Sequence, residues 1–152
     1  MPLALSMVAA PLIAGAVGGF VVSMGLSLQL LSEFSLAEAL HTGLVMSLFG
    51  VIIAVFVCYT FGAPLMLAAW ALAHFASWRS PHRMGLVMAG AGMAFAVIFF
   101  HDGSIAVDEL RSEGAIAFLI SLPAGLLGGY MAGWFVAMVG YTGVRKDETL
   151  SS

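Results

Sequence analysis

The sequence predicts an all-α integral membrane protein with four transmembrane helices in a compact bundle, and three observations lead to this prediction. Of the 152 residues, 62% are hydrophobic and 9% are charged, whereas a soluble domain has about 45–50% apolar and about 25% charged residues. A chain this short also buries too small a fraction of its surface to hide the excess from water. Finally, Asp, Glu, Lys and Arg are absent from four long windows of the chain, at 1–32, 39–78, 84–101 and 114–144.

Each uncharged window is long enough for a helix that crosses a bilayer, which needs about 20 apolar residues. Charged side chains are expensive at the centre of a bilayer, so they gather in the connections. Strands of a membrane β-barrel would instead appear as alternating segments of about ten residues. We therefore predict a single membrane domain over 1–152, with spans at about 5–31, 36–61, 82–100 and 115–141 and a short polar tail at 142–152.

The first window predicts a mature membrane span with a kink near Pro11. The small residues Ala14, Gly15 and Ala16 resemble the cleavage site of a signal peptide. A signal peptide also needs a positively charged start. No Lys or Arg precedes this apolar stretch, which continues well past the small residues. We therefore expect the segment to remain as a span.

The second window is the longest, and two local signals divide it. Ser35 and Glu38 have the spacing of a capping box, which predicts the start of a helix there. Pro64 lacks a backbone amide and clashes one turn back, which predicts a kink. We expect 36–61 to be the span and 64–77 to be a kinked extension or a helix along the inner surface. In a five-span alternative, 64–77 crosses separately and the amino terminus lies outside.

The last two spans have clearer boundaries. Ser80 and Pro81 suit the N-cap and the first position of the third helix. The fourth helix follows Gly114, and we expect it to bend at Pro123, because proline interrupts the helical hydrogen bonds.

The basic residues predict the orientation of the chain. The connection between the second and third spans holds Arg79 and Arg83, and Arg145 and Lys146 follow the last span. Lys and Arg are enriched in cytoplasmic connections. This pattern predicts a multi-pass protein of the cell inner (plasma) membrane with both termini in the cytoplasm.

Small residues recur at every fourth position of the first and fourth helices, so they fall on one face of each helix. In a membrane, such faces allow helices to approach closely. The predicted helix-packing residues are Gly15, Gly19 and Ser23 in the first helix and Ser121, Gly125, Gly129, Gly133 and Ala137 in the fourth. We expect these two helices to meet closely, or one of them to form a contact between copies. Alternatively, the small-residue faces line a ligand site or a narrow path.

The sequence offers few residues for chemistry. It has no Walker loop, HExxH or GxSxG motif, and Cys58 is its single cysteine. We therefore predict no catalytic residue and no cofactor. Residues near the outer ends of the second and third helices are the candidates for a divalent metal site, namely Glu38, His41, His101 and Asp102. The alternative is an acidic, solvated outer rim.

Three hypotheses for function follow. The leading hypothesis is a non-enzymatic packing or accessory subunit, or a self-associating helical bundle, whose partners are the lipid bilayer and a larger membrane complex or further copies. The second is a small oligomeric channel or transporter that prefers cations, with a path along the Gly, Ala and Ser faces. The third is a redox or quinone-associated subunit that uses the interfacial histidines. The net charge of −3 argues against nucleic acid as a partner.

Overall fold

The computed structural model describes residues 2–32, 34–102 and 113–150, and every regular element in these ranges is a helix. The chain is therefore all-helical, as predicted. The long elements are α1 (Pro2–Leu28), α2 (Leu36–Val57), α3 (Ala63–Phe75), α4 (Pro81–Asp102) and α5 (Glu113–Leu150). A short 3₁₀ segment, η1 (Gln29–Ser32), follows α1, and a π-helical segment, η2 (Cys58–Gly62), joins α2 to α3.

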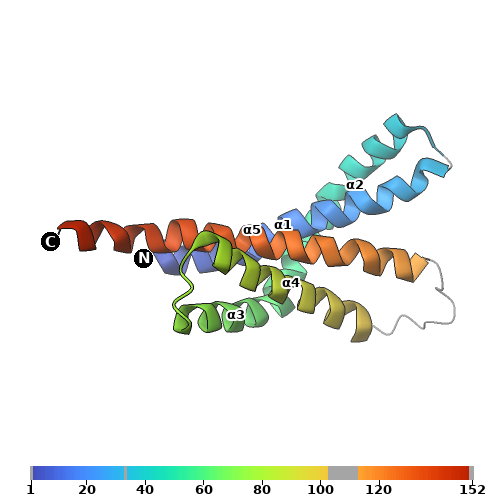
Figure 1. Ribbon diagram of the computed structural model, residues 1–152. Helices are drawn as coiled ribbons and strands as arrows, with labels where there is room; N and C mark the ends of the chain where they lie inside the picture. The colour runs from blue at the N-terminus through green and yellow to red at the C-terminus, as the bar shows by residue number, and fades with distance from the viewer. Residues whose placement is uncertain (1, 33, 103–112, 151–152) are drawn as a thin grey trace.

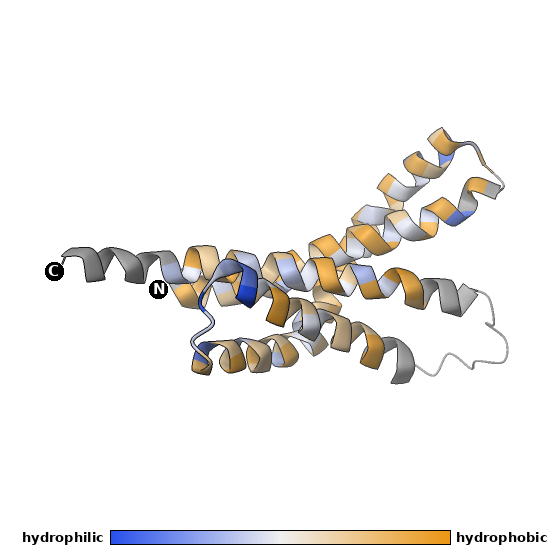
Figure 2. Ribbon diagram, in the orientation of Figure 1, coloured by the Kyte–Doolittle hydropathy of each residue, from blue (hydrophilic) through white to orange (hydrophobic). Residues whose placement is uncertain are grey.

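Four helical segments of the described chain are long and apolar enough to cross a membrane, in agreement with the predicted number. They are Leu3–Leu28, Leu36–Phe75, Pro81–Ile98 and Phe118–Tyr141. Apolar residues run along all of them in Figure 2, and hydrophilic residues mark the turn between α3 and α4.

The structure treats the three predicted kinks differently. Pro11 and Pro123 lie inside the continuous helices α1 and α5. Near Pro64, the chain changes direction between α2 and α3 but continues toward the end of the molecule that holds the amino terminus (Figure 1). The segment 63–75 is thus an extension of α2, and the described chain has no fifth long apolar helix.

The helices pack in the order α2, α1, α5, α4, and α3 packs beside α4. The α1–α2 pair and the α4–α5 pair diverge at one end of the molecule (Figure 1). At the other end lie the amino terminus, the α3–α4 turn and the carboxyl-terminal part of α5. Helix α2 packs mainly on α1 and makes no extensive contact with α4 or α5. The arrangement is therefore more open than a closed four-helix bundle.

Side-chain caps begin α2 and α4 as the sequence predicts. The Ser35 amide donates to Glu38 Oε2 at 3.0 Å, and the Glu38 amide donates to Ser35 Oγ at 3.4 Å, which completes the capping box. The amide of Arg83 donates to Ser80 Oγ at 3.4 Å. Both caps satisfy amides that have no partner within the helix.

The small-residue face of α5 packs against α4. A Cβ atom added to Gly125 would overlap the carbonyl oxygen of Gly92, and one added to Gly129 would overlap that of Met88. One added to Gly133 would lie 2.7 Å from Met88 Cβ. The two backbones are close enough that any side chain larger than hydrogen would separate them.

The small-residue face of α1 packs against α2. A Cβ atom added to Gly15 would lie 2.5 Å from Val55 Cα, and one added to Gly19 would lie 2.7 Å from the Gly50 carbonyl oxygen. Ser23 is buried against Gly50 in the same interface. The two predicted faces thus contact α2 and α4 rather than each other.

Helices α1 and α5 also meet, through residues one position away from these faces. A Cβ atom added to Gly128 would lie 2.6 Å from the Ala14 carbonyl oxygen, and one added to Gly18 would lie 3.6 Å from the Ala124 carbonyl oxygen. One residue along a helix is a rotation of about 100°. Each central helix therefore uses adjacent small-residue faces for two different neighbours.

We predict that Gly129→Leu lowers the free energy of unfolding in detergent by about 1–3 kcal/mol, because the side chain overpacks the α4–α5 contact. Thermal and denaturant unfolding followed by circular dichroism would measure this. Gly90→Leu is the matched control, since a Cβ atom there meets no heavy atom within 4 Å. Equal destabilisation by both substitutions would contradict the proposed origin of the effect.

Candidate functional site

The most irregular part of the described backbone is the junction between α2 and α3, where Pro64 follows the π-helical segment η2. A proline cannot donate the hydrogen bond that closes an ordinary helical turn. In a π-helix, each carbonyl pairs with the amide five residues later instead of four. The π-helical segment η2 ends two residues before Pro64, so the irregular backbone and the proline occur together.

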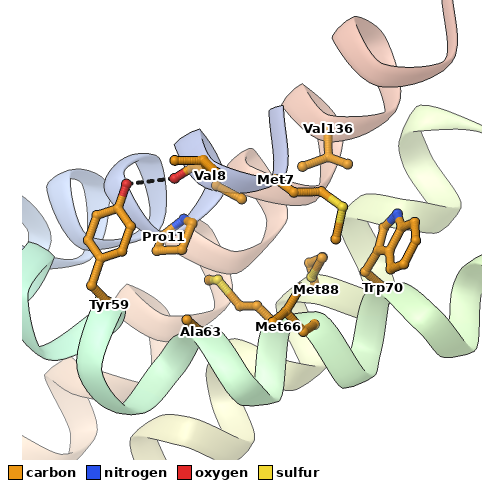
Figure 3. Close-up of a pocket in the computed structure, with 11 residues that line it drawn as sticks. Met7, Val8, Pro11, Tyr59, Ala63, Met66, Trp70, Met88 and Val136 are labelled. Carbon is orange, nitrogen blue, oxygen red and sulfur yellow. Dashed lines mark hydrogen bonds between the residues drawn. The ribbon is translucent and has the colours of Figure 1, made fainter. Parts of the chain in front are cut away.

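A tertiary hydrogen bond joins this junction to α1. Pro11 removes the helical donor for the carbonyl of Met7, and in the same turn the carbonyl of Val8 accepts a hydrogen bond from Tyr59 Oη at 2.6 Å (Figure 3). Tyr59 lies within η2, so the irregular segment and the proline-containing turn of α1 face each other. The bond fixes α1 against the bend of the α2–α3 segment.

A cavity of about 210 Å³ lies beside this hydrogen bond, and we call it the junction cavity. Tyr59 and Pro11 lie at one end and Trp70 at the other (Figure 3). The wall between them includes Met7, Ala63, Met66, Met88 and Val136. No charged side chain lines the cavity, so it suits a hydrocarbon group.

A second cavity of about 360 Å³ lies between the α1–α2 and α4–α5 pairs, and we call it the hairpin cavity. Six of the predicted helix-packing residues line it, namely Gly15, Gly19, Ser23, Ser121, Gly125 and Gly129. The Ser121 hydroxyl donates to the Phe118 carbonyl of its own helix at 2.7 Å. The remaining lining is almost entirely apolar, and no charged residue contributes to it.

Aromatic and basic side chains gather beyond the Trp70 end of the junction cavity, and we call Trp70, His74, Arg79 and Tyr141 the terminal cluster. The rings of Trp70 and His74 stack with their centroids 5.1 Å apart. His74 Nδ1 and Tyr141 Oη share a hydrogen bond of 3.0 Å, and the Arg79 guanidinium lies 5.9 Å from the centre of the Tyr141 ring. The cluster connects the end of α3 and the following turn to α5.

A second histidine–tyrosine pair connects α4 to α5 near the same turn. His82 Nδ1 and Tyr130 Oη share a hydrogen bond of 2.9 Å. His74 and His82 are thus each engaged with a tyrosine of α5 rather than with each other.

The indole N–H of Trp70 is the one fully buried side-chain polar atom of the described chain that has no hydrogen-bond partner there. Burying an unpaired donor of this kind costs about 1–3 kcal/mol. Trp70 lines the end of the junction cavity. Packing alone does not explain why its indole N–H is buried there without a partner.

The residues of the predicted metal site lie on two separate helices. Glu38 pairs with Ser35 in the capping box, and His41 follows one turn later on the surface of α2. His101 and Asp102 end α4, and their side chains lie outside the described residues. The start of α2 and the end of α4 lie on diverging arms of the molecule (Figure 1). Among the described residues, no group of three or more His, Cys, Asp or Glu is placed to hold a metal, and the metal site stays a prediction.

The sequence alone indicated no role for Tyr59, Trp70 or Tyr141 in this site. A usable signal exists for Tyr59, since a tyrosine inside an apolar helix needs a partner for its hydroxyl and prolines leave carbonyls available. The partner itself, 51 residues away, could not be identified from spacing.

Comparison of the chain with models of protein families, with curated proteins and with solved structures gave no match.

We predict that Tyr59→Phe lowers the free energy of unfolding by about 0.5–1.5 kcal/mol, because it removes the hydrogen bond to Val8. The measurement is denaturant unfolding in detergent. Thr60→Val is the control, because the Thr60 hydroxyl donates to Phe56 within the same helical segment and makes no link to α1. An unchanged stability in Tyr59→Phe would show that the link to α1 contributes nothing.

Proposed function

We propose that the chain is a non-enzymatic, multi-pass protein of the plasma (inner) membrane that acts as a packing or accessory subunit. The main observation behind the proposal is that the small-residue faces bring the backbones of neighbouring helices into direct contact within the chain. The described spans also hold no ionisable group arranged as a catalytic or ion-binding centre. Both cavities are apolar, so the protein offers surfaces for packing rather than for chemistry.

The long bulky surface of the α2–α3 segment supports an accessory role. Only 6% of its most hydrophobic window is buried within the chain, against 28–39% for the other three spans. Such a surface requires an apolar environment, because exposing it to water is unfavourable. We propose the bilayer itself as its surroundings, with a larger membrane complex as the partner of the protein as a whole.

We propose that both termini lie in the cytoplasm. The amino terminus and the carboxyl-terminal part of α5 lie at the same end as the α3–α4 turn (Figure 1), which contains Arg79 and precedes Arg83. Clustered Lys and Arg favour the cytoplasmic side. Helical spans also favour the plasma membrane over an outer membrane, where barrels are the rule.

Labelling of single cysteines with a membrane-impermeant thiol reagent tests this orientation. In a Cys58→Ala background, we expect Phe34→Cys to react in intact cells and Ala76→Cys to react only after permeabilisation. Both positions are exposed in turns or at helix ends. The reverse pattern of labelling would invert the topology.

The accessory role predicts a difference in assembly between the native membrane and the purified state. We expect the chain to migrate in a complex in gently solubilised native membranes that is heavier than the same chain purified and measured by light scattering. The two preparations should use the same detergent, so that the micelle contributes equally. Equal masses would contradict the accessory role.

The hairpin cavity supports a channel or transporter as the second candidate, since it lies along the faces where the sequence predicts a path. Its apolar lining offers little to replace the hydration of a cation, which makes ion passage costly. Flux of cations into liposomes that contain the purified chain decides between the two functions. We expect the flux to equal that of empty liposomes, and a flux that Gly125→Leu abolishes but Gly90→Leu leaves intact would establish the second candidate instead.

A further inference from the structure

Three features follow one another along α3 and the turn after it. The junction cavity runs beside α3 from Tyr59 to Trp70. The Trp70 ring lines the end of that cavity, and its indole N–H, which has no partner in the described chain, is covered by other atoms of the protein. Ring contacts and a hydrogen bond then lead through His74 and Tyr141 to the guanidinium of Arg79, whose side chain is exposed. An apolar space, a cluster of aromatic rings and an exposed cation thus occur in sequence.

We propose that this arrangement is a binding site for an anionic phospholipid. One acyl chain occupies the junction cavity against the Trp70 ring, and the phosphate lies beside Arg79. The apolar cavity and the exposed cation thus match the acyl chain and the anionic headgroup of a phospholipid. The proposal rests on the placement of the chain in a membrane made above.

Charge complementarity favours an anionic headgroup. The stretch from 63 to 98 contains Arg79, Arg83, His74 and His82 and no Asp or Glu. Basic pockets between membrane helices on the cytoplasmic side are suited to anionic headgroups. A zwitterionic headgroup would bring a positive charge to the same place and would gain less.

The apolar cavity favours a lipid over a free phosphate ion. Its volume of about 210 Å³ is enclosed by hydrocarbon, thioether and aromatic groups from α1, α3, α4 and α5. Burial of a hydrocarbon chain there adds a favourable term that an inorganic anion cannot provide. The exposed arginine alone would hold a phosphate weakly, because water screens a surface charge.

Fluorescence quenching tests the site in the full-length chain in detergent micelles. Substitutions Trp78→Phe and Trp134→Phe leave Trp70 as the single tryptophan of three. The probes are phosphatidylglycerol and phosphatidylcholine with the same brominated acyl chains. We expect phosphatidylglycerol to reach half-maximal quenching of Trp70 at a several-fold lower mole fraction than phosphatidylcholine. Equal quenching by the two lipids would overturn the proposal.

Two pairs of variants test the junction cavity, and one further variant tests the basic part of the site. Ala63→Leu narrows the junction cavity and should weaken binding of both lipids several-fold, whereas Ala68→Leu on the exposed side of α3 should not. Leu67→Phe at the cavity wall, with Leu72→Phe as its control, repeats the test with a milder change. Arg79→Gln should remove the preference for phosphatidylglycerol and leave phosphatidylcholine binding unchanged. Unaltered binding in both cavity variants would overturn the acyl-chain assignment.

Addition of inorganic phosphate separates a lipid site from a simple anion site. We expect millimolar phosphate, at constant ionic strength, to leave quenching by phosphatidylglycerol unchanged, and full displacement would overturn the proposal. Micelles have no inside or outside, so lipid binding is measured independently of the orientation. The thiol-labelling and complex-mass experiments test the proposed function, whereas quenching tests the lipid site, so a failure of one proposal can be told apart from a failure of the other.

Discussion

Contact between helices at backbone distance is the constraint on which the structure depends. Helices in a bilayer gain little from hydrophobic burial against one another, because lipid is equally apolar, and close packing must hold them together. The pairs Gly92–Gly125 and Ala14–Gly128 bring carbonyl oxygens against the Cα atoms of the neighbouring helix. Because α1 and α5 each carry small residues on two adjacent faces, they occupy the centre, and α2 and α4 flank them.

The prolines add a second constraint, which is local and electrostatic in origin. A backbone carbonyl without a donor is costly in an apolar medium, so a membrane helix must satisfy it in another way. The π-helical segment η2 precedes Pro64, and in the turn of α1 that contains Pro11 the Val8 carbonyl accepts a hydrogen bond from Tyr59. The two proline-containing turns thus face each other at the junction, which combines an irregular backbone, a long-range hydrogen bond and a cavity.

Among the described residues, Glu38 and His41 lie in the first turns of α2, whereas His74, Arg79, His82 and Arg83 lie around the α3–α4 turn, at the end that holds the termini. This distribution links the fold to the proposed functions. The spans are apolar and their hydroxyls bond largely to their own helices, as Ser27, Ser47 and Ser121 do. At that end, His74 and His82 bond to tyrosines of α5, and Arg79 lies over an aromatic ring. A protein built in this way offers apolar surfaces along its length and a basic aromatic rim where a lipid headgroup would lie.

The sequence by itself determined the helical class and the four apolar segments, because these depend on the transfer of apolar side chains out of water. It also determined the caps at Ser35 and Ser80, because a cap depends only on neighbours within one helical turn. It also identified the small residues at which helices would approach. The tertiary structure alone decided that Gly125 and Gly129 face α4 while Gly128 faces α1, and that Tyr59 reaches Val8. Helices that are apolar all round have no polar face to set their rotation. Their partners are therefore chosen by the fit of packed surfaces, which involves residues far apart in the chain.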